Sequence, residues 1–428
     1  MIHPDDCIDG DNLIRRTPSN NILQEPLIML TDTEFNRYAD VLIWALKTAR
    51  KNPFKQQDTI LLQYDPAALR LAEILYDRIL DMEINPVQRM GHTVTMEQSF
   101  YQKADGEQLV FQTPGDREIF QHINGRIFLR APDSLTHLKD VDPQKIGKVL
   151  VARKPLRDIL DKREEEGHYS WTLCTLPTVE LATQARMTAA QYKEQLIQAC
   201  YLDLEDPVSK WQSILKDVTG IKRWLNRLSV KSFHVESANV DLTITPGDKR
   251  KWVGISGHNI PSFELFLSPD WRGTEGFYYA NLPSFRSGNY VEGIRIAFRK
   301  GKVVSLKAET GEAFAVKQLA MDQGACRVGE FSLTDKRFSR IDRFMADTLF
   351  DENHGGEYGN CHIALGSSYS TTYDGDPAVL TKETKKKLGF NDSALHWDMV
   401  NTEDKTVTAH LTSGKKVVIY KGGKFRHP

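Results

Sequence analysis

The sequence lacks several features that would each indicate a class of protein. Its five cysteines are scattered and form no Cys-x-x-Cys pair, so we expect neither a disulfide framework nor a cysteine zinc cluster. No Gly-x-Gly-x-x-Gly or Walker loop occurs, and we therefore predict no nucleotide site. No apolar run approaches the roughly 20 residues of a membrane span. The N-terminus has neither the basic nor the apolar region of a signal peptide.

An excess of charge of either sign is also missing. The chain has 56 basic and 57 acidic residues and a formal net charge of -1, which predicts no nucleic-acid or membrane surface. With 428 residues it is too long for one ordinary core, so we expect two domains. Unpaired thiols and the lack of a signal peptide together predict a cytoplasmic protein.

The first half of the chain has the pattern of an α/β domain. After an irregular stretch at residues 1–30, short apolar runs alternate with segments whose apolar residues recur at helical spacing, and this alternation predicts a largely parallel sheet. We place this domain at residues 1–225. The predicted strands are 58–65, 125–131 and 171–175, and the predicted helices are 35–49, 66–79, 156–165 and 189–200.

Near residue 220 the pattern changes to alternation with a period of two, which is typical of antiparallel sheet. The chain from 226 to 428 is therefore predicted to be an α+β domain, with helices at 310–323 and 337–348. The predicted strands are 229–235, 240–245, 293–298, 302–308, 406–411 and 416–420.

This second domain contains short motifs of carboxylates and imidazoles. His396 and Asp398 flank a tryptophan, and two residues apart on a strand they would face the same side, where one metal ion or a pair could bind them. The alternative is a helix-capping aspartate beside a surface histidine. His362 lies in an apolar run, where a buried neutral imidazole is the commoner explanation.

Three glutamates extend this set. Glu330 could cap a helix, pair with Arg327 or bridge two ions. Glu264 lies in an apolar run and needs a partner, which could be a basic residue or a metal. Glu352 follows Asp351, and in an extended chain the two would face opposite ways. Together the residues suffice for two divalent ions, whereas one ion on His362, His396 and Asp398 is the simpler alternative.

The motifs also resemble, in order, those of the M29 aminopeptidases, the aminopeptidase T family. They are Asn-Ile-Pro-Ser-Phe-Glu at Glu264, Arg-Val-Gly-Glu at Glu330, Thr-Leu-Phe-Asp-Glu-Asn at Glu352, Cys-His-Ile-Ala-Leu-Gly at His362, Tyr369, and Asn-Asp-Ser-x-x-His-Trp-Asp at His396 and Asp398. The resemblance implies two Zn, Co or Mn ions held by Glu264, Glu330, His362, His396 and Asp398. It implies a further ligand or acid–base group at Glu352, and a hydrogen-bond donor to the transition state at Tyr369. It also implies a homodimer with an enclosed cavity that admits small peptides.

This sequence departs from the family pattern at one loop. Residues 354–359, His-Gly-Gly-Glu-Tyr-Gly, are inserted between Glu352 and His362, so either Glu352 or Glu357 could occupy the site. Two other functions remain open at this point. One is a ring-cleaving dioxygenase of the same fold with a single iron, although such a site would not need Glu264 and Glu330. The other is a binding protein with a degenerate site.

Overall fold

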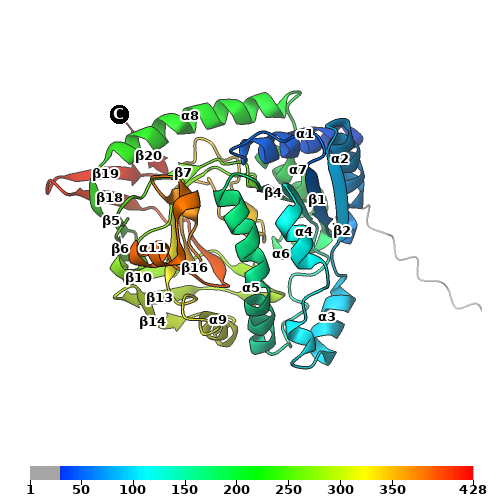
Figure 1. Ribbon diagram of the computed structural model, residues 1–428. Helices are drawn as coiled ribbons and strands as arrows, with labels where there is room; N and C mark the ends of the chain where they lie inside the picture. The colour runs from blue at the N-terminus through cyan, green and yellow to red at the C-terminus, as the bar shows by residue number, and fades with distance from the viewer. Residues whose placement is uncertain (1–28, 428) are drawn as a thin grey trace, which may run out of the picture.

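A computed structural model describes residues 29–427 of the chain (Figure 1). The irregular segment expected at residues 1–30 therefore falls almost entirely outside the described residues. Within residues 29–427, no helix combines the length and the apolar character needed to cross a membrane. The four cysteines of this range form no disulfide.

The N-terminal part is built on a parallel sheet, as the alternation of strands and helices predicts. Its strand order is β2-β1-β3-β4-β8, and every neighbouring pair is parallel. The strands are β1 (Thr59–Tyr64), β2 (Asn85–Met90), β3 (Gly125–Arg130), β4 (Ser170–Thr175) and β8 (Asn259–Ile260). The helices are α1 (Asp32–Thr48), α2 (Leu69–Asp81), α3 (Val94–Lys103), α4 (Asp116–His122), α5 (Pro143–Glu165), α6 (Val179–Gln184), α7 (Ala189–Ala199) and α8 (Pro207–Arg227).

The C-terminal part contains antiparallel sheets, which confirms the predicted fold class. An eight-stranded sheet has the order β14-β13-β10-β6-β5-β18-β19-β20, and a five-stranded sheet has the order β17-β16-β15-β9-β7. The strands of the larger sheet are β5 (Val230–Glu236), β6 (Asp241–Ile244), β10 (Glu275–Ala280), β13 (Ile294–Arg299), β14 (Lys302–Lys307), β18 (Thr406–Leu411), β19 (Lys416–Lys421) and β20 (Lys424–Phe425). Those of the smaller sheet are β7 (Val253–Gly254), β9 (Glu264–Leu267), β15 (Val328–Thr334), β16 (Asn360–Gly366) and β17 (His396–Asn401). The hairpin β11 (Ser284–Arg286)–β12 (Asn289–Val291) and the helices α9 (Glu312–Leu319), α10 (Thr348–Asp351) and α11 (Lys382–Lys387) complete this part.

The two parts share one hydrophobic core, which includes residues from Leu30 to Phe425. Strand β8 lies beyond residue 226 in the chain and yet pairs with β4 of the parallel sheet. Helix α5 stands between the blue N-terminal elements and the orange strand β16 in Figure 1. The division of the chain near residue 225 stays a prediction.

The predicted strands lie within one or two residues of the observed ones, whereas two predicted helices have different bounds and one prediction was wrong. The helix expected at 156–165 begins at Pro143, because the chain continues through Pro155 without leaving the helix. The helix expected at 310–323 ends at Leu319, and the Asp322 side chain then accepts from the backbone N–H groups of Gly324 and Ala325.

No helix fills 337–347, so the second helix prediction was wrong except at its last residue. Here the Asp351 carboxylate accepts from the backbone N–H groups of Met345 (2.7 Å) and Asp347 (3.1 Å). Side-chain acceptors of this kind compete with helical hydrogen bonds and stabilise an irregular loop.

Candidate metal centre

The candidate ligands lie on one face of the five-stranded sheet, and strand register brings them together. Ala364 of β16 lies opposite Glu330 of β15 on one side and opposite Asp398 of β17 on the other. Because side chains alternate along a strand, His362 shares the face of Ala364, and His396 shares the face of Asp398. The small side chain of Ala364 leaves room between the longer groups of its neighbours.

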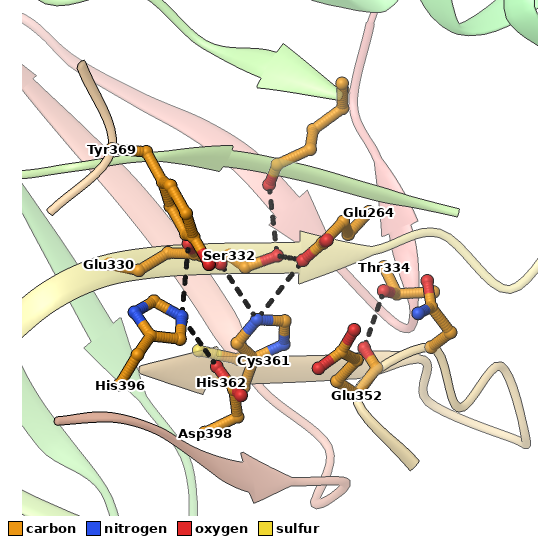
Figure 2. Close-up of polar contacts among 12 residues, drawn as sticks. Glu264, Glu330, Ser332, Thr334, Glu352, Cys361, His362, Tyr369, His396 and Asp398 are labelled. Carbon is orange, nitrogen blue, oxygen red and sulfur yellow. Dashed lines mark hydrogen bonds and ion pairs between the residues drawn. The ribbon is translucent and has the colours of Figure 1, made fainter. Parts of the chain in front are cut away.

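The first group of possible ligands is Glu264, Glu330 and His362. His362 Nε2 lies 3.2 Å from Glu264 Oε2 and 3.2 Å from Glu330 Oε1 (Figure 2). All three side chains are buried, and their ligand atoms lie within 4.8 Å of one another. Ser332 Oγ donates to Glu264 Oε2 at 2.8 Å and so fixes the orientation of that carboxylate.

The second group is Glu330, His396 and Asp398, whose ligand atoms also lie within 4.8 Å of one another. His396 Nε2 lies 3.5 Å from Asp398 Oδ1 and 3.8 Å from Glu330 Oε2. Its Nδ1 donates to the carbonyl of Ser367 at 3.0 Å, which leaves the Nε2 lone pair of the neutral ring for a metal. Glu330 therefore belongs to both groups, with a different oxygen turned toward each histidine.

Burial and the charges of neighbouring residues shift the pKa values of the ligand side chains. Burial raises the pKa of Glu330 to about 7 against the effect of His362. Burial alone would lower the pKa of His362, but the hydrogen bonds of Glu264 and Glu330 outweigh it, and the pKa lies well above its usual range. Burial likewise opposes ionisation of Asp398, but His396 lowers the pKa of that carboxyl to about 2.

Glu352 lies beside this cluster although it belongs to neither group. It caps the C-terminal end of α10, and its Oε1 accepts from Asn259 Nδ2 at 3.0 Å. Burial, together with the charges of Asp398 and Glu264, raises its pKa well above the usual range. Asp351 and Glu352 do not lie in extended chain: Asp351 is the last residue of α10, and Glu352 is its C-cap.

Tyr369 lies over the other end of the cluster. Its ring centroid is 4.8 Å from that of His396, and 37% of the residue is exposed. Burial of its polar end and the charge of Glu330 raise the pKa of the hydroxyl well above its usual value. The neutral phenol therefore keeps its proton available for donation.

Other candidates lie outside the cluster. Glu357 is exposed on the inserted loop, and Asp351 is occupied by the two backbone groups described above. His258 contacts Glu164 at 2.8 Å and packs on Trp171, so it has a structural role.

Sequence reasoning missed the polar residues that support the ligands, such as Ser332, Asn259 and Arg286. Arg286 donates from Nη1 to the carbonyl of His396 at 2.7 Å. Asn259 opens the motif at Glu264 but was not singled out, and no motif marks Ser332 or Arg286, since their contacts depend on the pairing of distant segments.

The composition of the cluster fits divalent metal ions. Four carboxylates (Glu264, Glu330, Glu352 and Asp398) lie near two imidazoles, and none of the four has a lysine or arginine ion-pair partner among residues 29–427. Acids are rarely buried without a cation or metal. Oxygen and imidazole donors without thiolates suit ions such as Zn, Co and Mn.

Comparisons with known proteins agree with this chemistry. A family model described as thermophilic metalloprotease (M29) matches residues 31–425. Aminopeptidase T of Thermus aquaticus is 30% identical over 273 residues, which cover 60% of this chain and 64% of that protein, just under two thirds of its length. Aminopeptidase 2 of Geobacillus stearothermophilus is 29% identical over 309 residues, covering 67% of this chain and 73% of that protein.

A solved structure has the same fold. The structure of wild-type AmpT from Thermus thermophilus matches with a TM-score of 0.72 and 20% identity. The match covers 91% of this chain and 99% of that chain.

Proposed function

Because the chain belongs to the M29 family of metallopeptidases, we propose that it is an aminopeptidase with a two-ion centre. The ligands would be Glu264, Glu330, His362, His396 and Asp398, and the reaction would release the N-terminal residue of short peptides. The relatives named above are themselves called aminopeptidases, which supports this choice of reaction.

The observation that carries the proposal is the position of Glu330. One of its oxygens is turned toward His362 and the other toward His396, and each histidine has a further carboxylate beside it. A carboxylate with two oxygens can bridge two ions, as in co-catalytic sites. A single ion would use only one of the two groups.

Two ions bound here would lower the pKa of a water molecule and polarise the substrate carbonyl. Glu352 is buried beside the ligands and contributes to neither group, so it would accept the proton of the attacking water and pass it to the leaving amine. Tyr369 would donate a hydrogen bond to the oxygen that gains negative charge. Asn259 holds Glu352 in place through its amide N–H.

The finer properties that the family resemblance implies are part of the same proposal. We propose Zn, Co or Mn as the ions, a homodimer as the assembly and the cytoplasm as the location. Metal analysis, sedimentation and cell fractionation test these three points separately.

The experiment that tests the function is hydrolysis of amino-acyl anilides by wild-type protein and by two variants, Glu330→Gln and His396→Ala. We expect both variants to lose hydrolysis and to keep the fold by circular dichroism. Glu357→Gln is a matched control, because it removes an exposed carboxylate from the inserted loop. If Glu330→Gln and His396→Ala both kept wild-type activity, the two-ion assignment would be wrong.

A further inference from the structure

Two arginines hold the segment that leads into the metal-binding strand β17. Arg286 of β11 donates to the carbonyl of His396 at 2.7 Å. Arg157 of α5 donates to the carbonyls of Ser393 (2.6 Å) and Ala394 (3.3 Å). The two guanidinium groups therefore bind backbone carbonyls at or just before His396, a proposed ligand. They come from a hairpin and from a helix.

Arg286 has more donors than partners. Its single side-chain hydrogen bond to residues 29–427 is the one to His396, and it forms no ion pair with any of them. Its Nε is shielded from solvent and has no hydrogen-bond partner in this range. Buried polar groups normally find partners, so a half-buried cation with unused donors needs an explanation.

Arg286 lies beside strand β17: it donates to the carbonyl of His396, and its Cζ is 5.6 Å from the centroid of the Trp397 ring. Burial lowers the pKa of Arg286 to about 10, the carboxylate of Asp398 opposes this shift, and the charge of Arg157 adds to it. The charge of Arg157 in turn lowers the pKa of Tyr369, against the larger effect of burial. Asp161 lies 4.0 Å from Arg157 Nε and offsets part of that charge, whereas Arg286 has no such neighbour within ion-pair distance among the described residues.

We infer that Arg286, with Arg157 as a second cation, binds the C-terminal carboxylate of a short peptide substrate. The inference rests on the proposed aminopeptidase function. A guanidinium presents two parallel N–H groups that match a carboxylate, and the Nη2 of Arg286 forms no hydrogen bond with residues 29–427, whereas its Nε is shielded from solvent.

The reach is suitable for a dipeptide or tripeptide. The carboxylate of such a peptide lies one or two residues beyond the cleaved bond, at roughly 3.5 Å per extended residue. Arg286 contacts the carbonyl of the same residue whose imidazole points into the cluster.

A purely structural role is the alternative, because the same two arginines satisfy backbone carbonyls next to His396. In that role their loss would weaken hydrolysis of every substrate to the same degree. A carboxylate site would instead affect only substrates that carry a free carboxylate.

The test therefore compares leucylglycine with leucylglycinamide, which differ only in the C-terminal carboxylate. The variants are Arg286→Gln, Arg286→Lys and the exposed control Arg299→Gln, which removes the same charge from β13. For wild type we expect kcat/KM to favour the free acid. In Arg286→Gln we expect the ratio of acid to amide to fall by roughly 10- to 100-fold, as is usual for a lost hydrogen bond to a charged group. Arg286→Lys should recover part of the ratio, and Arg299→Gln should leave it unchanged.

Hydrolysis of leucine anilide, which has no carboxylate, reports the proposed function independently. If wild type cleaves the anilide but shows no preference for the acid, or if Arg286→Gln lowers both dipeptide rates equally, the carboxylate site is overturned and the peptidase stands. If wild type with added metal cleaves neither the anilide nor the dipeptides, the proposed function fails and the site fails with it.

Discussion

Replacing Glu330 with glutamine should change stability in opposite directions with and without metal. In the metal-free protein the carboxylate is buried among other acids, and its pKa is about 7 in place of the ordinary 4.5. That difference corresponds to a cost of about 3 kcal/mol for holding the charged form in the folded state at pH 8. Glutamine has nearly the same shape and no charge, so the metal-free variant should be more stable than wild type.

The sign of the pH dependence follows from the raised pKa. Between pH 4.5 and 7 the unfolded chain gives up this proton while the folded chain retains it. Metal-free wild type should therefore lose stability as the pH rises through this window, and the full cost should be present above pH 7. The advantage of Glu330→Gln should be near its maximum at pH 8 and almost absent below pH 4.5.

Bound metal should make wild type more stable than Glu330→Gln. Loss of a supporting residue around a metal commonly lowers affinity by 10- to 100-fold, and loss of a shared direct ligand should cost at least as much for each ion. In excess metal, each hundredfold loss of affinity removes about 2.7 kcal/mol of stabilisation. For two ions this exceeds the gain of about 3 kcal/mol from removing the charge.

Thermal unfolding of wild type, Glu330→Gln and the control Glu357→Gln measures both effects, in EDTA and in excess cobalt, at pH 5 and pH 8. The expected result is a higher melting temperature for Glu330→Gln in EDTA at pH 8 and a lower one in cobalt. A variant that is less stable than wild type in EDTA at pH 8, or equally stabilised by cobalt, would refute the reasoning.

Three further predictions concern residues around the ligands. Glu352→Gln should lower kcat by about 10²- to 10⁴-fold with the metal content retained, as expected for a proton-transfer group; loss of metal in this variant would make Glu352 a ligand instead. Tyr369→Phe should lower kcat by roughly 10²-fold and change KM little, and an unchanged kcat would remove the hydroxyl from the reaction. Lys405 is 2% exposed, and burial lowers its pKa to about 8 against the attraction of Cys361. Lys405→Met should therefore stabilise the protein by up to about 3 kcal/mol at pH 7 in urea unfolding, and this gain should shrink between pH 8 and 10.5, where the wild-type lysine loses its charge. A gain that stays constant over that range would exclude the charge as its cause.

The sequence predicted the fold class and the candidate residues because both depend on local patterns. The spacing of His396 and Asp398 predicted that both would share one face if they lay on a strand, and β17 is such a strand. An acid inside an apolar run marked Glu264, which the structure buries against His362. These signals need no knowledge of which strands are neighbours.

The geometry of the cluster could not be predicted in this way. Glu330 meets His362 through the pairing of β15 with β16, and the register of that pair shifts at a bulge between Val328 and Glu330. Such a shift depends on both strands together. The inserted loop posed the same problem, since only the folded chain separates buried Glu352 from exposed Glu357.

The prediction of a helix at 337–348 was wrong because a contact between side chain and backbone replaces the helical hydrogen bonds. Its apolar residues recur at a suitable spacing, but the Asp351 side chain binds the backbone of Met345 and Asp347 and replaces helical hydrogen bonds. The arginines at the cluster were not marked by any pattern, because Arg157 and Arg286 reach it from a helix and a hairpin far apart in the sequence.

Anomalous X-ray diffraction from crystals grown with cobalt or zinc tests the two-ion centre most directly. Two peaks are expected, one between Glu264 and His362 and one between His396 and Asp398, with Glu330 between them and a separation of roughly 3.5–4 Å. A single peak, or none at saturating metal, would contradict the assignment of Glu330 as a bridge between two ions.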